Sequence, residues 1–143
     1  MQLQRDILTA EETLSIGQET LDKIIDMTFF DYKVGDQFFI KNHPKDRYMV
    51  LHDDYDKQEK DVVLTYGDGQ KAFFNDVYPL FTTGMLIELL SFHFDFNLQT
   101  FGGKWVLIWN GTALIVQNEE DEHLVTFLWK ALADIVQSDK YTW

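Results

Sequence analysis

The sequence contains no cysteine and only two prolines among its 143 residues. Without cysteine there is no disulfide framework, thiolate nucleophile, iron–sulfur cluster or cysteine-based zinc site. No apolar run approaches the roughly 18 residues that span a bilayer, because Glu88, Lys130 and Asp134 interrupt the longest apolar segments. The first residues also lack the basic region and apolar run of a secretory signal. We therefore expect a soluble, cytoplasmic protein.

Basic residues are scarce: 12 lysines and arginines stand against 24 acidic residues, which gives a formal net charge of −12. A protein that binds nucleic acid directly needs a cationic groove to neutralise phosphates, and anionic membranes make the same demand. The charge therefore argues against both partners. What the chain has in quantity is apolar surface, with 45% hydrophobic and 15% aromatic residues, which is enough to fill the core of a folded domain.

The first half of the sequence predicts a helix followed by short strands. Thr9 and Glu12 have the spacing of a capping box, which is typical of a helix start. We expect this helix to run from about 10 to 27, with a break at Gly17. The remaining predicted elements are a strand at 47–52, an exposed loop at 53–60, a strand at 61–66, a turn at 67–69 and a strand at 70–74.

The second half predicts a helix, a three-strand meander and a final helix. Thr82 or Thr83 can cap a helix from about 84 to 92. Asn118 is expected to cap the last helix, with acidic residues 119–122 in its first turn and an apolar body up to Val136. The predicted strands are 95–101, 104–109 and 112–117, and they are joined by the turns Gly102-Gly103 and Asn110-Gly111.

These elements define an α+β fold. It consists of an N-terminal helix with a small antiparallel sheet, then a helix, a three-strand antiparallel meander and a C-terminal helix. Residues 1–143 are expected to form one compact domain, or two subdomains that meet near 76–81.

No pattern of catalytic residues is present. The sequence has no Walker lysine motif and no Gly-x-Ser-x-Gly elbow. The nearest approach to a metal pattern is His52 with Asp53, Asp54 and Asp56, and it would need further ligands from elsewhere. We expect no enzymatic activity, no catalytic residues, no cofactor and no metal site.

Acidic residues concentrate at two places in the sequence. Such clusters keep a small protein dispersed, and they can also dock on a cationic groove by electrostatic complementarity. The candidate partner-binding residues are Asp53, Asp54 and Asp56 in the first cluster and Glu119, Glu120, Asp121 and Glu122 in the second.

A stretch in the middle of the chain carries a resemblance. Tyr78-Pro79-Leu80-Phe81-Thr82 is followed by the Leu-rich segment 86–90, a tryptophan-bearing sheet and the apolar segment 123–132. In this order the chain resembles a group of small uncharacterised phage and prophage proteins from gut bacteria, and it is similar to the phage helix–sheet–helix sandwich domain. The resemblance implies an origin in a mobile element and a place in the host bacterial cytosol, and it transfers no catalytic motif.

Charge and resemblance together suggest a function. Small acidic phage proteins often inhibit a host protein by occupying its surface, so we expect a non-enzymatic phage protein that binds and inhibits a host protein with a basic surface. A defence nuclease such as a CRISPR effector is the leading target, which would make the chain an anti-CRISPR-like protein or a DNA mimic. The alternative is an accessory protein that forms a homodimer through the apolar helix at 124–136.

Overall fold

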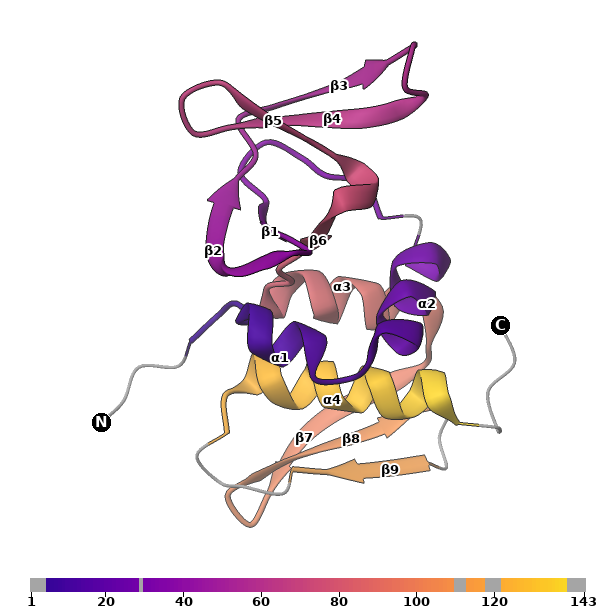
Figure 1. Cartoon of the computed structure of the whole chain (residues 1–143). Helices are drawn as coiled ribbons and strands as arrows, with labels where there is room; N and C mark the ends of the chain where they lie inside the picture. Colours follow the sequence, from indigo (N-terminus) through magenta and orange to yellow (C-terminus); the bar gives the residue numbers. More distant parts are fainter. Residues whose placement is uncertain (1–4, 29, 110–112, 118–121, 139–143) are drawn as a thin grey trace. The chain divides into compact units, whose positions relative to one another are not determined.

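The computed structural model describes residues 5–28, 30–109, 113–117 and 122–138 (Figure 1). The chain divides into two compact units. Unit 1 combines the N-terminal residues up to Thr28, apart from Thr9–Glu11, with the chain from Phe81 onward. Unit 2 comprises Thr9–Glu11 and Phe29–Leu80. In the sequence, unit 2 is therefore inserted between the two parts of unit 1.

The helices belong to the α+β fold that the sequence predicted. Gly17 has a φ of +90°, a conformation that suits glycine, and it separates the first two helices as expected. The Thr82 hydroxyl accepts a hydrogen bond from the amide of Met85 at 3.2 Å and so caps the third helix. The four helices are α1 (Ala10–Leu14), α2 (Gln18–Thr28), α3 (Thr83–His93) and α4 (Leu124–Gln137).

The meander of unit 1 is confirmed. Its central strand pairs antiparallel with both neighbours, with Leu98 and Ile115 both opposite Leu107. The Gly102-Gly103 turn joins the first two strands, whereas the expected Asn110-Gly111 turn lies outside the described residues. The strands are β7 (Phe96–Phe101), β8 (Lys104–Trp109) and β9 (Ala113–Val116).

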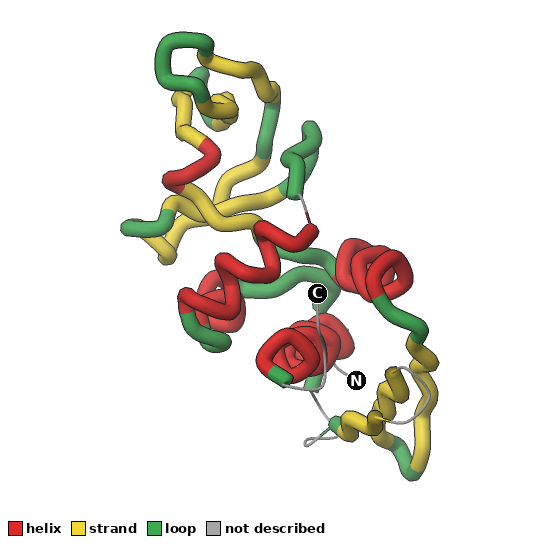
Figure 2. Tube along the Cα trace, turned by 90° about the vertical axis from the view of Figure 1, so that its right-hand side faces the viewer, coloured by secondary structure: helices red, strands yellow, loops and turns green. Residues whose placement is uncertain are grey.

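Helix α4 forms the centre of unit 1. It packs against α2, α3 and β8, and the helices all lie on one side of the β7–β8–β9 sheet (Figures 1 and 2). Because other elements surround α4, apolar residues around most of its circumference are buried. They include Val125, Phe127, Leu128, Trp129, Leu132 and Ile135.

The start of α4 differs from the prediction. The helix begins at Leu124 with His123 at the N-cap, and Glu122 precedes it in a bend. Glu122 therefore does not stand in its first turn. The expected cap, Asn118, and the acidic residues 119–121 lie outside the described residues. A run of acids resembles a helix start in the sequence, but this helix begins at Leu124.

The sequence suggested that the N-terminal helix lies beside the small sheet of the N-terminal half. In the structure, helix α2 belongs to unit 1, where it packs against α4. Its apolar face carries Leu21 and Ile24, which are both fully buried. Near its start, the Thr20 hydroxyl accepts a hydrogen bond from Gln137 Nε2 at 2.9 Å. The helix therefore buries its apolar face in unit 1.

Unit 2 contains two antiparallel three-stranded sheets. The first has the order β2–β1–β6 and the second has the order β3–β4–β5. Edge-to-face aromatic contacts, such as Tyr32 with Phe74, fill the core, which also includes Phe38 and Leu64. The bounds are β1 (Gln37–Ile40), β2 (His43–Met49), β3 (His52–Asp56), β4 (Asp61–Tyr66), β5 (Gln70–Phe73), the 3-10 turn Phe74–Asp76 and β6 (Val77–Pro79).

The predictions for strand 61–66 and for the 67–69 turn are confirmed, but the predicted strand at 47–52 is wrong. The chain passes from one sheet to the other at Val50 and Leu51. The amide of Val50 donates to the Asp36 carbonyl at 2.8 Å, and the amide of Leu51 donates to the Thr65 carbonyl at 2.8 Å. The apolar run that reads as one strand is therefore the junction of two strands.

None of the helices formed by the described residues combines the length and apolarity that crossing a membrane requires.

Candidate functional site

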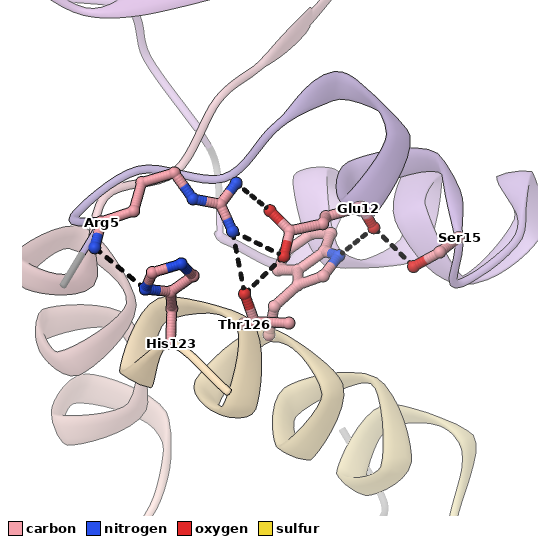
Figure 3. A network of polar contacts seen from close by, with 6 residues as sticks. Arg5, Glu12, Ser15, His123 and Thr126 are labelled. Atoms are coloured by element: carbon pink, nitrogen blue, oxygen red, sulfur yellow. Dashed lines mark hydrogen bonds and ion pairs between the residues drawn. The ribbon is translucent and has the colours of Figure 1, made fainter. Parts of the chain in front are cut away.

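A polar network in unit 1 centres on Glu12 (Figure 3). The Arg5 guanidinium donates to both carboxylate oxygens, at 2.6 Å to Oε1 and 3.0 Å to Oε2. The Thr126 hydroxyl, from α4, donates to Oε2 as well. The Glu12 carbonyl oxygen accepts from Trp129 Nε1 at 3.1 Å and from the Ser15 hydroxyl at 2.6 Å. A bidentate Arg–carboxylate pair of this kind has strong geometric specificity.

The network fastens the N-terminal segment to α3 and α4. The amide of Arg5 donates to His123 Nδ1 at 3.0 Å. The adjoining residues form an isolated bridge between Ile7 and Thr82, and the amide of Leu8 donates to the Phe81 carbonyl at 3.0 Å. The segment before α1 is thus held at both the start of α3 and the start of α4.

Chemically, the network is a structural latch. Its two hydroxyls, on Ser15 and Thr126, both donate to oxygens of Glu12. The Glu12 carboxylate holds both the Arg5 guanidinium and the Thr126 hydroxyl. The side chains of Arg5 and Glu12 are only 30% and 21% exposed, and their ion pair orders the N-terminal segment.

The structure places Asp53, Asp54 and Asp56 on a strand, where a loop was expected. They belong to β3, an edge strand that pairs with β4, and Asp53 and Asp54 are exposed. The Asp56 carboxylate is less available to a partner protein, because it accepts hydrogen bonds from the amides of Gln58 and Glu59 at 2.9 and 3.0 Å. Charged residues on an edge strand can protect it from pairing with another chain, and the binding role expected for this cluster stays a prediction.

Glu122 is turned inward. Its side chain is only 7% exposed, and its carboxylate lies 2.6 Å from the Lys130 ammonium. Its carbonyl oxygen accepts from Gln117 Nε2 at 2.8 Å, while Gln117 Oε1 accepts from the amide of Trp105. This residue therefore contributes little to an acidic surface. The other members of its cluster, Glu119, Glu120 and Asp121, lie outside the described residues.

A third acidic group, which is not among the candidate partner-binding residues, lies along α2. Glu19, Asp22 and Asp26 are spaced at i, i+3 and i+7, which puts them on one side of a helix. Together with Lys23 and Met27 they line a shallow depression that is open to solvent. The three residues show a helical period in the sequence, but they are not contiguous, unlike the acids at 53–56 and 119–122.

Charge is divided unequally between the two units. Unit 1 contains 13 acidic and 5 basic residues, a formal net charge of −8, and unit 2 contains 11 and 7, a net charge of −4. The excess of negative charge is thus concentrated in the unit that contains α2.

No three histidine, aspartate or glutamate side chains are grouped closely enough to hold a metal ion within the described ranges. Comparisons with models of protein families, with curated proteins and with solved structures found no match.

Proposed function

We propose that this chain is a non-enzymatic acidic protein of a phage or mobile element that binds a basic surface of a host protein and inhibits it. The row of carboxylates on α2, formed by Glu19, Asp22 and Asp26, is the observation that carries the proposal. We refer to these three residues as the α2 acidic row. A nucleic-acid-binding defence nuclease in the host cytosol, such as a CRISPR effector, is the target class that this charge suits best.

The geometry of the α2 acidic row resembles that of a phosphate backbone. An α-helix rises about 1.5 Å per residue, so the three carboxylates extend over roughly 10 Å. Their density is therefore about one charge per 5 Å, and one strand of duplex DNA carries one charge per about 3.4 Å of axis. A groove that accepts phosphates would meet charges of the same sign at a comparable spacing.

The surroundings of the row favour electrostatic attraction over long range. Unit 1 has a net charge of −8, and a field of one sign accelerates the approach of an oppositely charged partner. Because salt screens this attraction with a Debye length of about 8 Å at physiological ionic strength, binding is expected to weaken steeply as salt is added.

The test compares two triple variants that remove the same charge. One neutralises the α2 acidic row, as Glu19→Gln, Asp22→Asn and Asp26→Asn. The matched control neutralises β3, as Asp53→Asn, Asp54→Asn and Asp56→Asn. The wild type and both variants are immobilised and used to capture proteins from a bacterial lysate, and duplex DNA is added to displace whatever occupies a DNA-binding groove.

We expect the wild type and the β3 variant to retain a protein that duplex DNA displaces, and the α2 variant to retain at least tenfold less of it. Equal retention by both variants would assign no role to the α2 acidic row. Absence of any DNA-displaceable protein on the wild type would refute mimicry of nucleic acid.

The alternative, a homodimer through the helix at 124–136, gains no support from a specific observation. The apolar residues of that segment belong to α4 and are buried within unit 1, where Leu128, Trp129 and Leu132 are completely covered. The outward side of the helix carries Lys130 and Asp134, which are exposed. A second chain would have to displace the core of the first to reach the apolar residues.

A further inference from the structure

One face of the β7–β8–β9 sheet has no covering layer among the described residues. The helices lie on the other side of the sheet (Figures 1 and 2), where Leu107 and Trp109 are buried. Phe101 and Val116 are 83% and 46% exposed. We call the uncovered side the open face. Its register positions include Asn97, Gln99, Phe101, Val106, Ile108 and Val116.

The open face is more apolar than a sheet face that meets water. Antiparallel sheets with one solvated side normally alternate apolar residues inward and polar residues outward. Strand β8 does not alternate in this way, because Val106 and Ile108 point away from the helices while Leu107 points toward them. An apolar residue on both sides of a central strand is typical of a strand that is buried on both sides.

The strands of the open face also carry no negative charge. No aspartate or glutamate occurs in β7, β8 or β9, in a chain that contains 24 acidic residues. Two copies of a protein with a net charge of −12 repel each other wherever carboxylates would meet. On this face they can approach without placing one carboxylate against another.

We propose that the open face is the interface of a weak two-fold homodimer. Two sheets pack face to face about 10 Å apart, and a two-fold axis between them makes the same patch serve both copies. The axis lies between the two sheets, parallel to them and perpendicular to their strands. Each end of the open face in one copy then lies over the opposite end of the open face in the second copy. Lys104 stands at one end of the face and Asp95, which is exposed, precedes β7 at the other.

This arrangement brings Lys104 of each copy to Asp95 of the other, so the face is complementary to itself in charge as well as in apolar character. Within one chain these two residues cannot meet. Phe101 is opposite Lys104 and Phe96 is opposite Trp109, so about six residues of strand, or roughly 20 Å, separate Asp95 from Lys104.

The size of the face limits the strength of the dimer. Three strands about 4.8 Å apart and up to six residues long give a projected area of roughly 300 Å². Standard interfaces bury about 800 Å² on each partner. We therefore expect dissociation constants of about 10 to 500 μM, so that the monomer predominates at low concentration.

The first experiment measures the molecular mass of the full chain by sedimentation equilibrium from about 5 μM to 1 mM, at constant salt. The wild type is expected to shift from monomer to dimer over this range. The substitution Ile108→Asp places a charge at the centre of the open face and should weaken dimerisation at least tenfold. The matched control Leu51→Asp adds the same charge at an exposed apolar residue of unit 2 and should leave it unchanged.

The second experiment exchanges the charges at the two ends of the face. Lys104→Asp and Asp95→Lys should each weaken the dimer about two- to tenfold, since rim pairs contribute modestly, and the double variant should restore it. Because the two residues are too far apart to pair within a chain, restoration reports a contact between copies. A wild type that is monomeric at 1 mM, an Ile108→Asp variant that dimerises normally, or a double variant that is not restored would overturn the proposal.

Discussion

Replacing Tyr32 with phenylalanine is expected to stabilise unit 2. The Tyr32 side chain is 2% exposed, and its hydroxyl has no hydrogen-bond partner in the part of the chain that the structure describes. A buried donor without a partner costs about 1–3 kcal/mol. The space left by the oxygen, roughly 10 Å³, costs about 0.2 kcal/mol at 24 cal/mol per Å³. The substitution should therefore raise the free energy of unfolding by about 1–3 kcal/mol.

The pH dependence gives the same residue a second signature. Burial, with a smaller effect from the Asp36 carboxylate, raises the pKa of the Tyr32 hydroxyl well above its ordinary value of 10.0. Above pH 10 the unfolded chain loses this proton while the folded chain keeps it, so alkali favours unfolding. Above pH 10, the free energy of unfolding of the wild type should fall by up to about 1.4 kcal/mol per pH unit relative to that of the Tyr32→Phe variant. Between pH 6 and 9 the difference between the two proteins should stay constant.

Unfolding by urea, followed by far-ultraviolet circular dichroism, measures both effects. Tryptophan fluorescence is unsuitable, since the described tryptophans, Trp105, Trp109 and Trp129, all belong to unit 1. Tyr55→Phe is the matched control, because its ring is 56% exposed and its hydroxyl meets water. A Tyr32→Phe variant less stable than the wild type at pH 7, or a stability difference that stays constant up to pH 11, would refute the reasoning.

Two further predictions concern unit 1. Glu12→Gln should lower the free energy of unfolding by about 1–3 kcal/mol, because it leaves the Arg5 guanidinium without its charged partner. The fluorescence of Trp129 can follow this unfolding. The control Glu11→Gln, at an exposed position, should have no effect. Gly17→Ala should cost about 1–2 kcal/mol because φ is +90° there, whereas Gly84→Ala, in helix α3 with its Cβ in ordinary contact, should be neutral or stabilising. Equal effects of the two glycine substitutions in urea unfolding would contradict this explanation.

The meander and the helix starts at Gly17 and Thr82 could be predicted because their signals are local. Glycine turns set the register of β7 with β8, and the Thr82 hydroxyl caps the residues next to it. Each of these signals acts within a few residues, and the surrounding structure does not override them.

The errors arose where distant contacts determine the local structure. Asp53 and Asp54 have low strand propensity, yet pairing with β4 makes them a strand. The sequence suggests that Glu122 is exposed, but its carboxylate accepts a hydrogen bond from Lys130, which follows eight residues later. The latch at Glu12 joins residues more than 110 positions apart, and no local pattern announces such a contact. The α2 acidic row was visible in the sequence as a helical period, but it is not contiguous.

The insertion of unit 2 into unit 1 sets an order for folding during synthesis. Most residues of unit 2 lie in one continuous stretch that ends at Leu80, so all of its strands have been made before α3 begins. Unit 1 has to wait for α4, the helix around which its other elements pack. Because domains fold as they emerge from the ribosome, helix α2 leaves it early but cannot bury Leu21 and Ile24 until some hundred residues later, and during that interval its apolar face is open to chaperones.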